Sequence, residues 1–266
     1  MSIFLKTEDE IELMRRANRL VSRTLAELAK HIKPGVTTSQ LDKIAGEFIR
    51  DYGAVPTFKD FPNPYGPPFP ANICTSVNDV VVHGIPDEKT VLREGDIISV
   101  DCGALLDGFN GDSCYTFCVG EVDEAKRRLL AVTRQALYEA INVAVEGNHL
   151  GDIGATVQEL CEAEGYGVVR ELTGHGIGRK MHEDPMVPNY GKRGNGKRLK
   201  AAMCIAIEPM ITMGSREIYM DPDRWTIRTR DGQPAAHFEH TIAIRRGHAD
   251  ILSSFEEIDS LVDNIN

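Results

Sequence analysis

Apolar side chains recur at the spacing of an α-helix in four stretches of this chain. These stretches cover residues 8–32, the residues that follow Thr38, 123–146 and 152–164. The first begins with a capping box of Thr7 and Glu10 and ends at Pro34-Gly35, and the last two each end near a glycine. We therefore predict four helices, each with one apolar face.

Runs rich in apolar and β-branched residues lie between these helical stretches and predict β-strands. The runs read DVVVHGI, DIISVDCGAL, SCYTFCVG, MCIAIEPM, TIRTR and FEHTIAI. Two helices followed by strands occur twice along the chain, without sequence identity between the two occurrences. We therefore expect one α+β domain, residues 1–266, built from duplicated halves at roughly 1–120 and 121–266, with helices covering one face of an antiparallel sheet.

The segment 61–70, FPNPYGPPFP, contains five prolines and cannot form a regular helix or strand. One interpretation is a rigid loop that forms the wall of a pocket, and the other is a polyproline ligand for another protein. The compact succession of predicted elements favours the pocket wall.

The bulk composition places the chain among globular proteins. Of its 266 residues, 42% are hydrophobic, which is sufficient to bury a substantial core. It has no run of about 18 apolar residues, the length that spans a membrane, and its first residues lack the basic and apolar parts of a signal peptide. We therefore expect a cytoplasmic, monomeric protein without a membrane partner.

Cysteine usage and charge limit the partners further. The six cysteines include no C-x-x-C pair and mostly have apolar neighbours, which indicates buried, reduced thiols. A formal net charge of -10 at pH 7 argues against a broad nucleic-acid surface, and we expect no recognition of a specific nucleic-acid sequence. The local run GKRGNGKRLK, which ends at Lys200, is basic. It is either a solvated loop, the commoner case, or a transient contact with the ribosome.

Two aspartates fall in a predicted hairpin, DIISVDCGALLDGFNGDSCYTF, in which Asp107-Gly108 is a strong signal for a tight turn. Asp101 and Asp112 share one face of the hairpin when the turn is centred on Asp107-Gly108. They also share it, and are directly opposed, when the centre lies one residue earlier. Two such carboxylates among apolar side chains must share a proton or a cation. The alternative is that Asp112 caps a turn and Asp101 ends a strand.

Two glutamates and a histidine have similar surroundings. Glu208 ends the run CIAIEPM and Glu239 enters the run FEHTIAI, where a charged carboxylate needs an ion-pair partner, a proton or a metal. His175 stands between glycines in LTGHGIGRKMHEDP, which suggests that its imidazole needs room to reach a metal. Each glutamate alone is also compatible with a salt bridge at a strand edge. Together, carboxylates and one imidazole suit divalent ions, and two such ions can activate a water for hydrolysis.

These residues occur in motifs that resemble those of type I methionine aminopeptidases, a family with the so-called pita-bread fold, and the resemblance runs nearly end to end. The motifs are NDVVVHGIP, SVDCGALLDGFNGD, GHGIGRKMHEDP, IEPM and FEHT. The resemblance implies removal of the initiator methionine from peptides and nascent chains whose second residue is small. It also implies two divalent metal ions, of Co, Mn, Fe or Zn, held by Asp101, Asp112, His175, Glu208 and Glu239, with Asp112 and Glu239 bridging the ions.

The resemblance assigns further roles. His83 would contact the scissile amide and help to protonate the leaving nitrogen, His182 would steady the substrate carbonyl, and Glu208 would act as general base or proton shuttle. The pocket for the methionine side chain would be lined by Cys74, Trp225, Tyr65 and Phe69. The loop NPYGPPFP differs from that of familiar members. The start close to the first helix and the short distance from His182 to Glu208 are typical of the short bacterial form.

Two other functions are compatible with this fold. An Xaa-Pro peptidase typically has a large additional N-terminal domain, for which 266 residues leave no room. A metal-free homologue that acts as a binding protein or chaperone would lack at least one metal ligand, and none is missing here. The sequence therefore favours the aminopeptidase.

Overall fold

The computed structural model of the chain describes residues 3–265, with the side chains of residues 3–262. The four predicted helices are confirmed as α1 (Glu8–Ala29), α2 (Thr38–Asp51), α3 (Glu124–Val143) and α4 (Leu150–Ala163). The predicted capping box of Thr7 and Glu10 is present at α1. A fifth helix, α5 (Glu256–Ile265), is absent from the prediction. No helix within the described residues is long and apolar enough to cross a bilayer.

The strands form one large and two small antiparallel sheets. The large sheet has the order β1-β4-β5-β14-β9-β7-β8, with β2 beside β4 and β15 beside β14. Its strands are β1 (Val55–Pro56), β2 (Cys74–Val77), β4 (Ile97–Leu106), β5 (Phe109–Cys118), β7 (Gly174–Gly176), β8 (Glu183–Val187), β9 (Cys204–Ile207), β14 (Glu239–Ile244) and β15 (Ala249–Ile251). One small sheet contains β13 (Ala235–His237), β10 (Met210–Thr212) and β6 (Gly167–Val168), and the other contains β11 (Ile218–Met220), β12 (Ile227–Thr229) and β3 (Val80–Val82).

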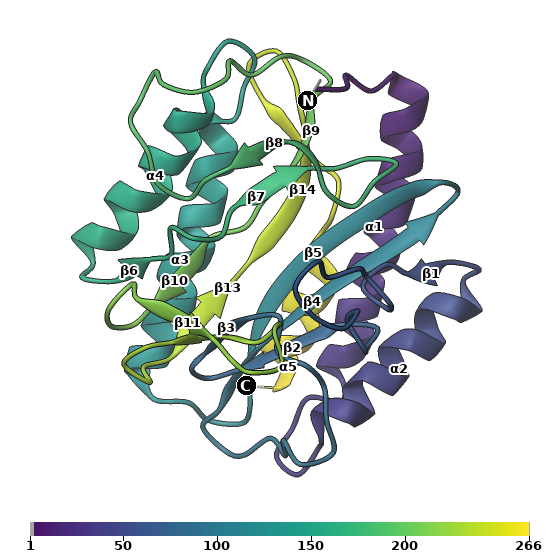
Figure 1. Cartoon of the computed structure of the whole chain (residues 1–266), viewed down its shortest axis with the longest axis vertical. Coiled ribbons are helices and arrows are strands. Elements are labelled where there is room, and N and C mark those ends of the chain that lie inside the picture. The colour runs from purple at the N-terminus through teal and green to yellow at the C-terminus, as the bar shows by residue number, and fades with distance from the viewer. Residues whose placement is uncertain (1–2, 266) are drawn as a thin grey trace.

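Helices and sheets enclose an apolar core. In Figure 1, α1 and α2 lie to the right of the central strands, and α3 and α4 lie to the left. Helix α1 packs against β4 and β5, and α3 packs against α4 and β13. The core between them includes the fully buried side chains of Leu25, Leu28, Leu129, Ile205 and Ile242. Each such side chain stabilises the fold by about 1.5–3 kcal/mol, and their packing fixes the sheet that carries the site.

Gly111 in β5 allows helix α1 to approach the sheet closely. A Cβ atom at this position would lie 2.5 Å from the backbone carbonyl carbon of Ala17 in α1. The close approach brings the buried Asn18 to the sheet, where its Oδ1 accepts a hydrogen bond from the Asp112 backbone N–H at 3.1 Å. Because side chains alternate along a strand, Asp112 points to the face opposite that of Gly111, away from α1.

The hairpin of β4 and β5 has one of the two registers that the sequence allows. Its turn consists of Asp107-Gly108 alone, with φ angles of 52° and 80° that suit a type I′ turn. Asp101 pairs with Cys114, which lies two residues beyond Asp112 along β5. The two aspartates are therefore diagonal neighbours on one face of the sheet, not directly opposed residues.

The cysteines agree with the prediction of reduced thiols. All six are free in the structure, and five of them are buried. Burial raises the pKa of the buried Cys74 and Cys102 thiols, and the nearby Asp101 carboxylate raises it further. These thiols are therefore protonated, inert parts of the core.

Candidate metal centre

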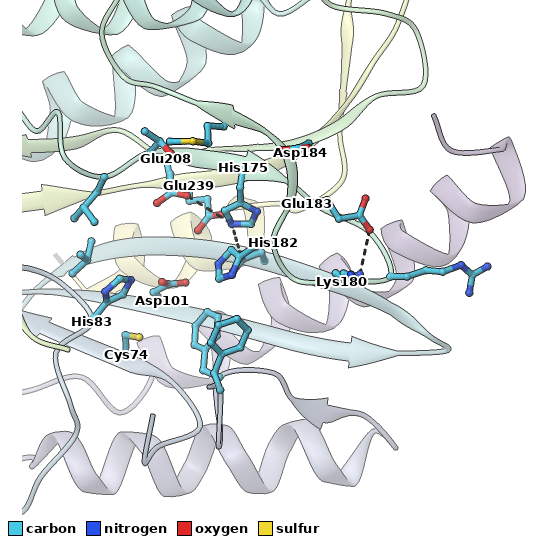
Figure 2. Close-up of a pocket in the computed structure, with 18 of the residues that line it drawn as sticks. Cys74, His83, Asp101, His175, Lys180, His182, Glu183, Asp184, Glu208 and Glu239 are labelled. Carbon is cyan, nitrogen blue, oxygen red and sulfur yellow. Dashed lines mark hydrogen bonds and ion pairs between the residues drawn. The ribbon is translucent and has the colours of Figure 1, made fainter. Parts of the chain in front are cut away.

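A cavity of about 1020 Å³ joins residues that lie far apart in the sequence. Its wall combines the carboxylates predicted as metal ligands, four histidines and a set of apolar side chains. Figure 2 shows two groups of side chains that face each other across it: His175, Glu208 and Glu239 on one side, and Asp101, His83 and Cys74 on the other. The cavity thus brings all five predicted ligands together.

The geometry of the ligand cluster suits a cation. Asp112, His175 and Glu239 each offer one ligand atom, and these atoms lie within 4.8 Å of one another. The Nε2 atom of His175 is 3.4 Å from Asp112 Oδ2 and 3.8 Å from Glu208 Oε1. Oxygen atoms and one imidazole nitrogen at this spacing form a donor set for a borderline divalent metal.

The buried oxygens of the cluster need such a cation. Asp101 Oδ1, Asp112 Oδ1 and Glu239 Oε1 are buried and accept no hydrogen bond within the described residues. Burial raises the pKa of these three carboxyl groups and of Glu208, and repulsion from the neighbouring carboxylates raises the pKa of Asp101, Glu208 and Glu239 further. A divalent ion would neutralise the charges and bind the unpaired oxygens, so the residues fit the metal.

The tautomer of His175 also suits metal binding. Its Nδ1 donates a hydrogen bond to the carbonyl oxygen of Gly176 at 2.9 Å. The Nε2 atom therefore carries the lone pair on the side of Asp112 and Glu208. Burial lowers the pKa of His175 to about 4, so its ring is neutral at pH 7, the form that binds a metal.

The glycines beside His175 have a different role from the one that the sequence suggested. A Cβ atom at Gly174 would lie 2.3 Å from the carbonyl oxygen of Ala206 in β9, and one at Gly176 would lie 2.2 Å from the carbonyl oxygen of Asp184 in β8. Both glycines therefore permit β7 to pack tightly between its neighbours. They fix the strand from which the imidazole projects and do not clear space around the ring.

His83 and His182, the two histidines predicted to face the substrate, line the same cavity. His83 has a φ angle of 57°, in the left-handed region that costs a residue other than glycine about 1–2 kcal/mol. Such strain is typical of positions where function fixes a side chain. His182 is exposed, and its ring packs edge-on against the rings of His175 and Phe61, with centroids 4.4 and 5.1 Å apart.

Apolar side chains form another part of the cavity wall. Phe69 and Cys74 are buried in a cluster with Phe58, Phe61 and Trp225, all of which line the cavity. The ring of Trp225 packs edge-on against Phe69 at 5.2 Å, and its Nε1–H donates a hydrogen bond to the carbonyl oxygen of Pro67 at 2.8 Å. The proline-rich segment is therefore fastened as a loop that contributes to the pocket wall, as the sequence predicts.

Tyr65 is not brought to this wall. Its side chain is 85% exposed and does not line the cavity, whereas Phe58 and Phe61 do. The sequence does not single out either phenylalanine. A proline-rich loop has no periodicity from which the direction of a side chain can be predicted, so only the structure separates the lining aromatics from the exposed one.

His237 is a fourth histidine of the cavity wall that the sequence motifs do not single out. Its side chain is 2% exposed, and its Nε2 lies 3.7 Å from Glu208 Oε2. Burial, together with the nearby His83, lowers the pKa of His237 to about 3. Its position two residues before Glu239 is the signal that could have found it, because alternate residues of a strand share a face.

The carboxylates and His175 of the cavity form a donor set for a divalent metal, the kind of site at which metal-dependent hydrolases activate water. The chain matches the sequence model of metallopeptidase family M24 over residues 12–246, and it belongs to this family. This membership agrees with the resemblance found in the motifs and with a bound divalent metal.

Similar members of the family are methionine aminopeptidases. The one from Clostridium acetobutylicum is 48% identical over 254 residues, which are 96% of this chain and 100% of the relative. Methionine aminopeptidase 1 of Bacillus subtilis is 47% identical, with 94% and 99% covered. The crystal structure of the methionine aminopeptidase from Rickettsia prowazekii has a TM-score of 0.91 at 40% identity and covers 95% of this chain and 100% of its own. The fold is therefore the predicted pita-bread fold.

Proposed function

We propose that this chain removes the N-terminal methionine from peptides and nascent chains whose second residue is small. One observation carries the proposal: the metal-ligand cluster and an apolar group of Phe58, Phe61, Phe69, Cys74 and Trp225 line the same cavity. An unbranched apolar side chain can occupy the apolar part while its peptide bond lies at the ligand cluster. Relatives at 48%, 47% and 40% identity carry the name methionine aminopeptidase, which supports this assignment.

We infer that the site holds two divalent ions, of Co, Mn, Fe or Zn. We propose that Asp101, Asp112, His175, Glu208 and Glu239 would hold these ions. The four carboxylate charges balance two divalent ions, and the absence of thiolates from this set favours the borderline metals. When bound, the ions supply a water of lowered pKa and stabilise negative charge on the scissile carbonyl.

The remaining polar side chains have separate tasks in this proposal. Glu208 accepts the proton of the attacking water and passes it on, because its carboxylate lies at the edge of the cluster, between His175 and His237. His83 donates an N–H hydrogen bond to the scissile amide. Burial and the nearby His182 lower the pKa of His83 to about 4, so the ring is a neutral donor. His182, which is more exposed, contacts the substrate carbonyl.

Hydrolysis of short peptides tests the proposal. The metal-free protein is reconstituted with Mn²⁺, Co²⁺ or Fe²⁺ and given Met-Ala-Ser, Met-Trp-Ser, Leu-Ala-Ser and Ala-Pro-Ser. We expect cleavage of Met-Ala-Ser with at least one ion, and little cleavage of the other three. If no peptide is cleaved with any ion, the result contradicts an enzymatic function and favours a binding protein. Preferential cleavage of Ala-Pro-Ser would favour the function of an Xaa-Pro peptidase. The Xaa-Pro dipeptidase of Bacillus anthracis, 21% identical at a TM-score of 0.75, shares the fold alone.

Action on nascent chains implies a cytoplasmic location and a transient contact with the ribosome, which we propose for the basic run 192–200. All of its residues except Leu199 are exposed, and Arg193 forms an ion pair with Glu159 at 2.6 Å. The lysines of the run form no ion pair with the described residues and are therefore available for ribosomal RNA. The double variant Lys192→Glu/Lys197→Glu should reduce cosedimentation with ribosomes and leave Met-Ala-Ser cleavage unchanged. Equal cosedimentation of the variant and the parent would identify the run as a solvated loop.

A further inference from the structure

The backbone of His237 is held by two hydrogen bonds, whereas its buried ring nitrogen Nε2 is held by none. The His237 N–H donates a hydrogen bond to Thr116 Oγ1 at 3.0 Å, and Thr116 Oγ1 donates one to the His237 carbonyl oxygen at 2.7 Å. The ring nitrogen Nε2 is buried and has no hydrogen-bond partner among the described residues. Buried polar atoms are almost always paired, so an unpaired one on a cavity wall indicates a partner in the working state.

The Glu208 carboxylate lies next to this nitrogen. Its Oε2 is 3.7 Å from His237 Nε2, and its Oε1 is 3.8 Å from His175 Nε2. Strand pairing produces this arrangement, because Met210 of β10 pairs with His237 of β13, and Glu208 lies two residues before Met210. Diagonal neighbours on paired strands face the same side of the sheet. The two oxygens of Glu208 thus face two different histidines.

The backbone of Glu208 is held by a residue other than His237. Asn189, which is buried, donates a hydrogen bond from Nδ2 to the Glu208 carbonyl oxygen at 2.8 Å. The main chain at this point is therefore fixed, and the rotation of the carboxylate is the remaining freedom of the residue.

We propose that His237 is a positioning residue, which donates a hydrogen bond from Nε2–H to Glu208 Oε2 and so directs Oε1 toward His175 and the metal centre. The present 3.7 Å separation has to close only to about 2.8 Å, the length of a hydrogen bond to a carboxylate. A carboxylate oxygen has more than one lone pair, so Oε2 can accept this bond and still take a proton from the attacking water. The inference rests on the proposed function, because it places Glu208 at the metal centre.

Three variants separate the hydrogen bond from the volume of the ring. His237→Gln keeps a donor, His237→Phe keeps a ring without a donor, and His237→Ala removes both. Calorimetric titration of each metal-free protein with Mn²⁺ measures the metal affinity without turnover. Partners of metal ligands contribute about 10–100-fold to affinity or activity. We therefore expect His237→Phe and His237→Ala to bind Mn²⁺ about 10–100-fold more weakly, and His237→Gln to recover most of the loss.

Two further measurements distinguish positioning from packing. The visible absorption of the Co²⁺-loaded protein depends on how the ligands are arranged, so it should change in His237→Phe and stay close to that of the parent in His237→Gln. For Met-Ala-Ser, kcat should fall in His237→Phe while KM changes little, because His237 acts through Glu208 and not on the substrate. The melting temperature of each metal-free variant shows whether it is folded.

The proposal is overturned if folded His237→Phe keeps the Mn²⁺ affinity and the Co²⁺ absorption of the parent, because the ring then only fills space. It is also overturned if His237→Gln is as weak as His237→Ala, because a donor at this position is then not sufficient. A parent protein that binds Mn²⁺ but cleaves no methionyl peptide contradicts the proposed function instead. The calorimetric comparison of the variants remains decisive in that case, so the two failures can be told apart.

Discussion

The substitution Asp112→Asn tests whether the buried carboxylates are arranged around a cation. It keeps the shape of the side chain and removes one negative charge from the cluster, where Asp112 Oδ2 lies 3.4 Å from His175 Nε2. Without metal this charge is unfavourable, because burial raises the pKa of Asp112 and the Asp112 carboxylate raises the pKa of Glu239. When the metal is bound, the same Asp112 carboxylate is a metal ligand and its charge is favourable. The effect on stability should therefore change sign when the metal is added.

The size of both effects can be estimated. In the metal-free protein the Asp112 carboxyl group is buried, and its Oδ1 has no hydrogen-bond partner among the described residues. Asn keeps a polar atom there but removes the charge that repels Glu239. We take this relief as the lower end of the about 1–3 kcal/mol that an unpaired buried polar group costs. Relief of about 1 kcal/mol raises the melting temperature of a chain of this length by roughly 2–4 °C. A ligand at about 100 times its Kd stabilises a protein by about 2.7 kcal/mol, which corresponds to roughly 5–10 °C. The metal-free Asp112→Asn variant should therefore melt roughly 2–4 °C above the metal-free parent. Addition of metal should raise its melting temperature by much less than the roughly 5–10 °C expected for the parent.

Differential scanning calorimetry of both proteins, first with EDTA and then with excess Mn²⁺, measures the two shifts. Asp107→Asn is the matched control, because it makes the same change in the same hairpin, at an exposed turn residue paired with Arg16. It should leave the increase with Mn²⁺ intact. The reasoning is refuted if metal-free Asp112→Asn melts several degrees below the parent, or if Mn²⁺ stabilises it as much as it stabilises the parent.

Three further changes test other parts of the molecule. Trp225→Leu removes the ring that supports Phe69 and should raise KM for Met-Ala-Ser about 10-fold, and a changed Mn²⁺ affinity would contradict this role. Lys6 Nζ lies 2.6 Å from Glu183 Oε2 in a nearly buried ion pair, so Lys6→Met should lower the free energy of unfolding in urea by about 3–5 kcal/mol. The double variant Lys6→Met/Glu183→Gln should recover part of this stability. No recovery would show that the unpaired Glu183 charge is not the cause of the loss. Burial lowers the pKa of His240 to about 3, so protons bind preferentially to the unfolded chain. The stability contributed by the neutral, buried His240 ring is complete above pH of about 6.5 and is lost as the pH falls toward 3. The variant His240→Gln should reduce the pH dependence of the free energy of unfolding, measured by urea titrations between pH 7 and 4. An unchanged pH dependence would show that His240 is not responsible for it.

Local signals explain which parts of the fold could be predicted. The capping box of Thr7 and Glu10 and the Asp107-Gly108 turn each lie within a few residues of the element that they define, and the structure confirms both. Helix α5 also has a local signal, with apolar residues at helical spacing from Phe255, which the prediction omits. The register of the hairpin could not be decided, because either centre of the turn leaves the two aspartates on one face.

The assembly of the site could not be predicted from local patterns. Strand β14 lies between β5 and β9, so Glu239 meets Asp112 and Glu208 only through pairing of segments that are more than 100 residues and about 30 residues distant in sequence. No periodicity encodes such pairing: the residues alone indicated candidate carboxylates and an imidazole, and the resemblance of the motifs supported their combination into one ligand set. Tyr65 and His237 show the same limit from opposite sides: a residue predicted to line the pocket that is exposed to solvent, and a residue of the cavity wall that no motif contains.

Glu208 occupies the junction between two sheets, and this position explains why its neighbours are histidines. Strand β9 of the large sheet ends just before it and β10 of a small sheet begins just after it. His175 belongs to the large sheet and His237 to the small one, so each sheet contributes one imidazole to the carboxylate. A lysine or arginine there would favour the ionised form of Glu208, which would oppose the proton uptake that the proposed reaction requires. Burial lowers the pKa of His175 to about 4 and of His237 to about 3, so both rings are neutral at pH 7. His237 can therefore orient the carboxylate through its N–H, and neither neutral ring opposes a change in the protonation state of Glu208.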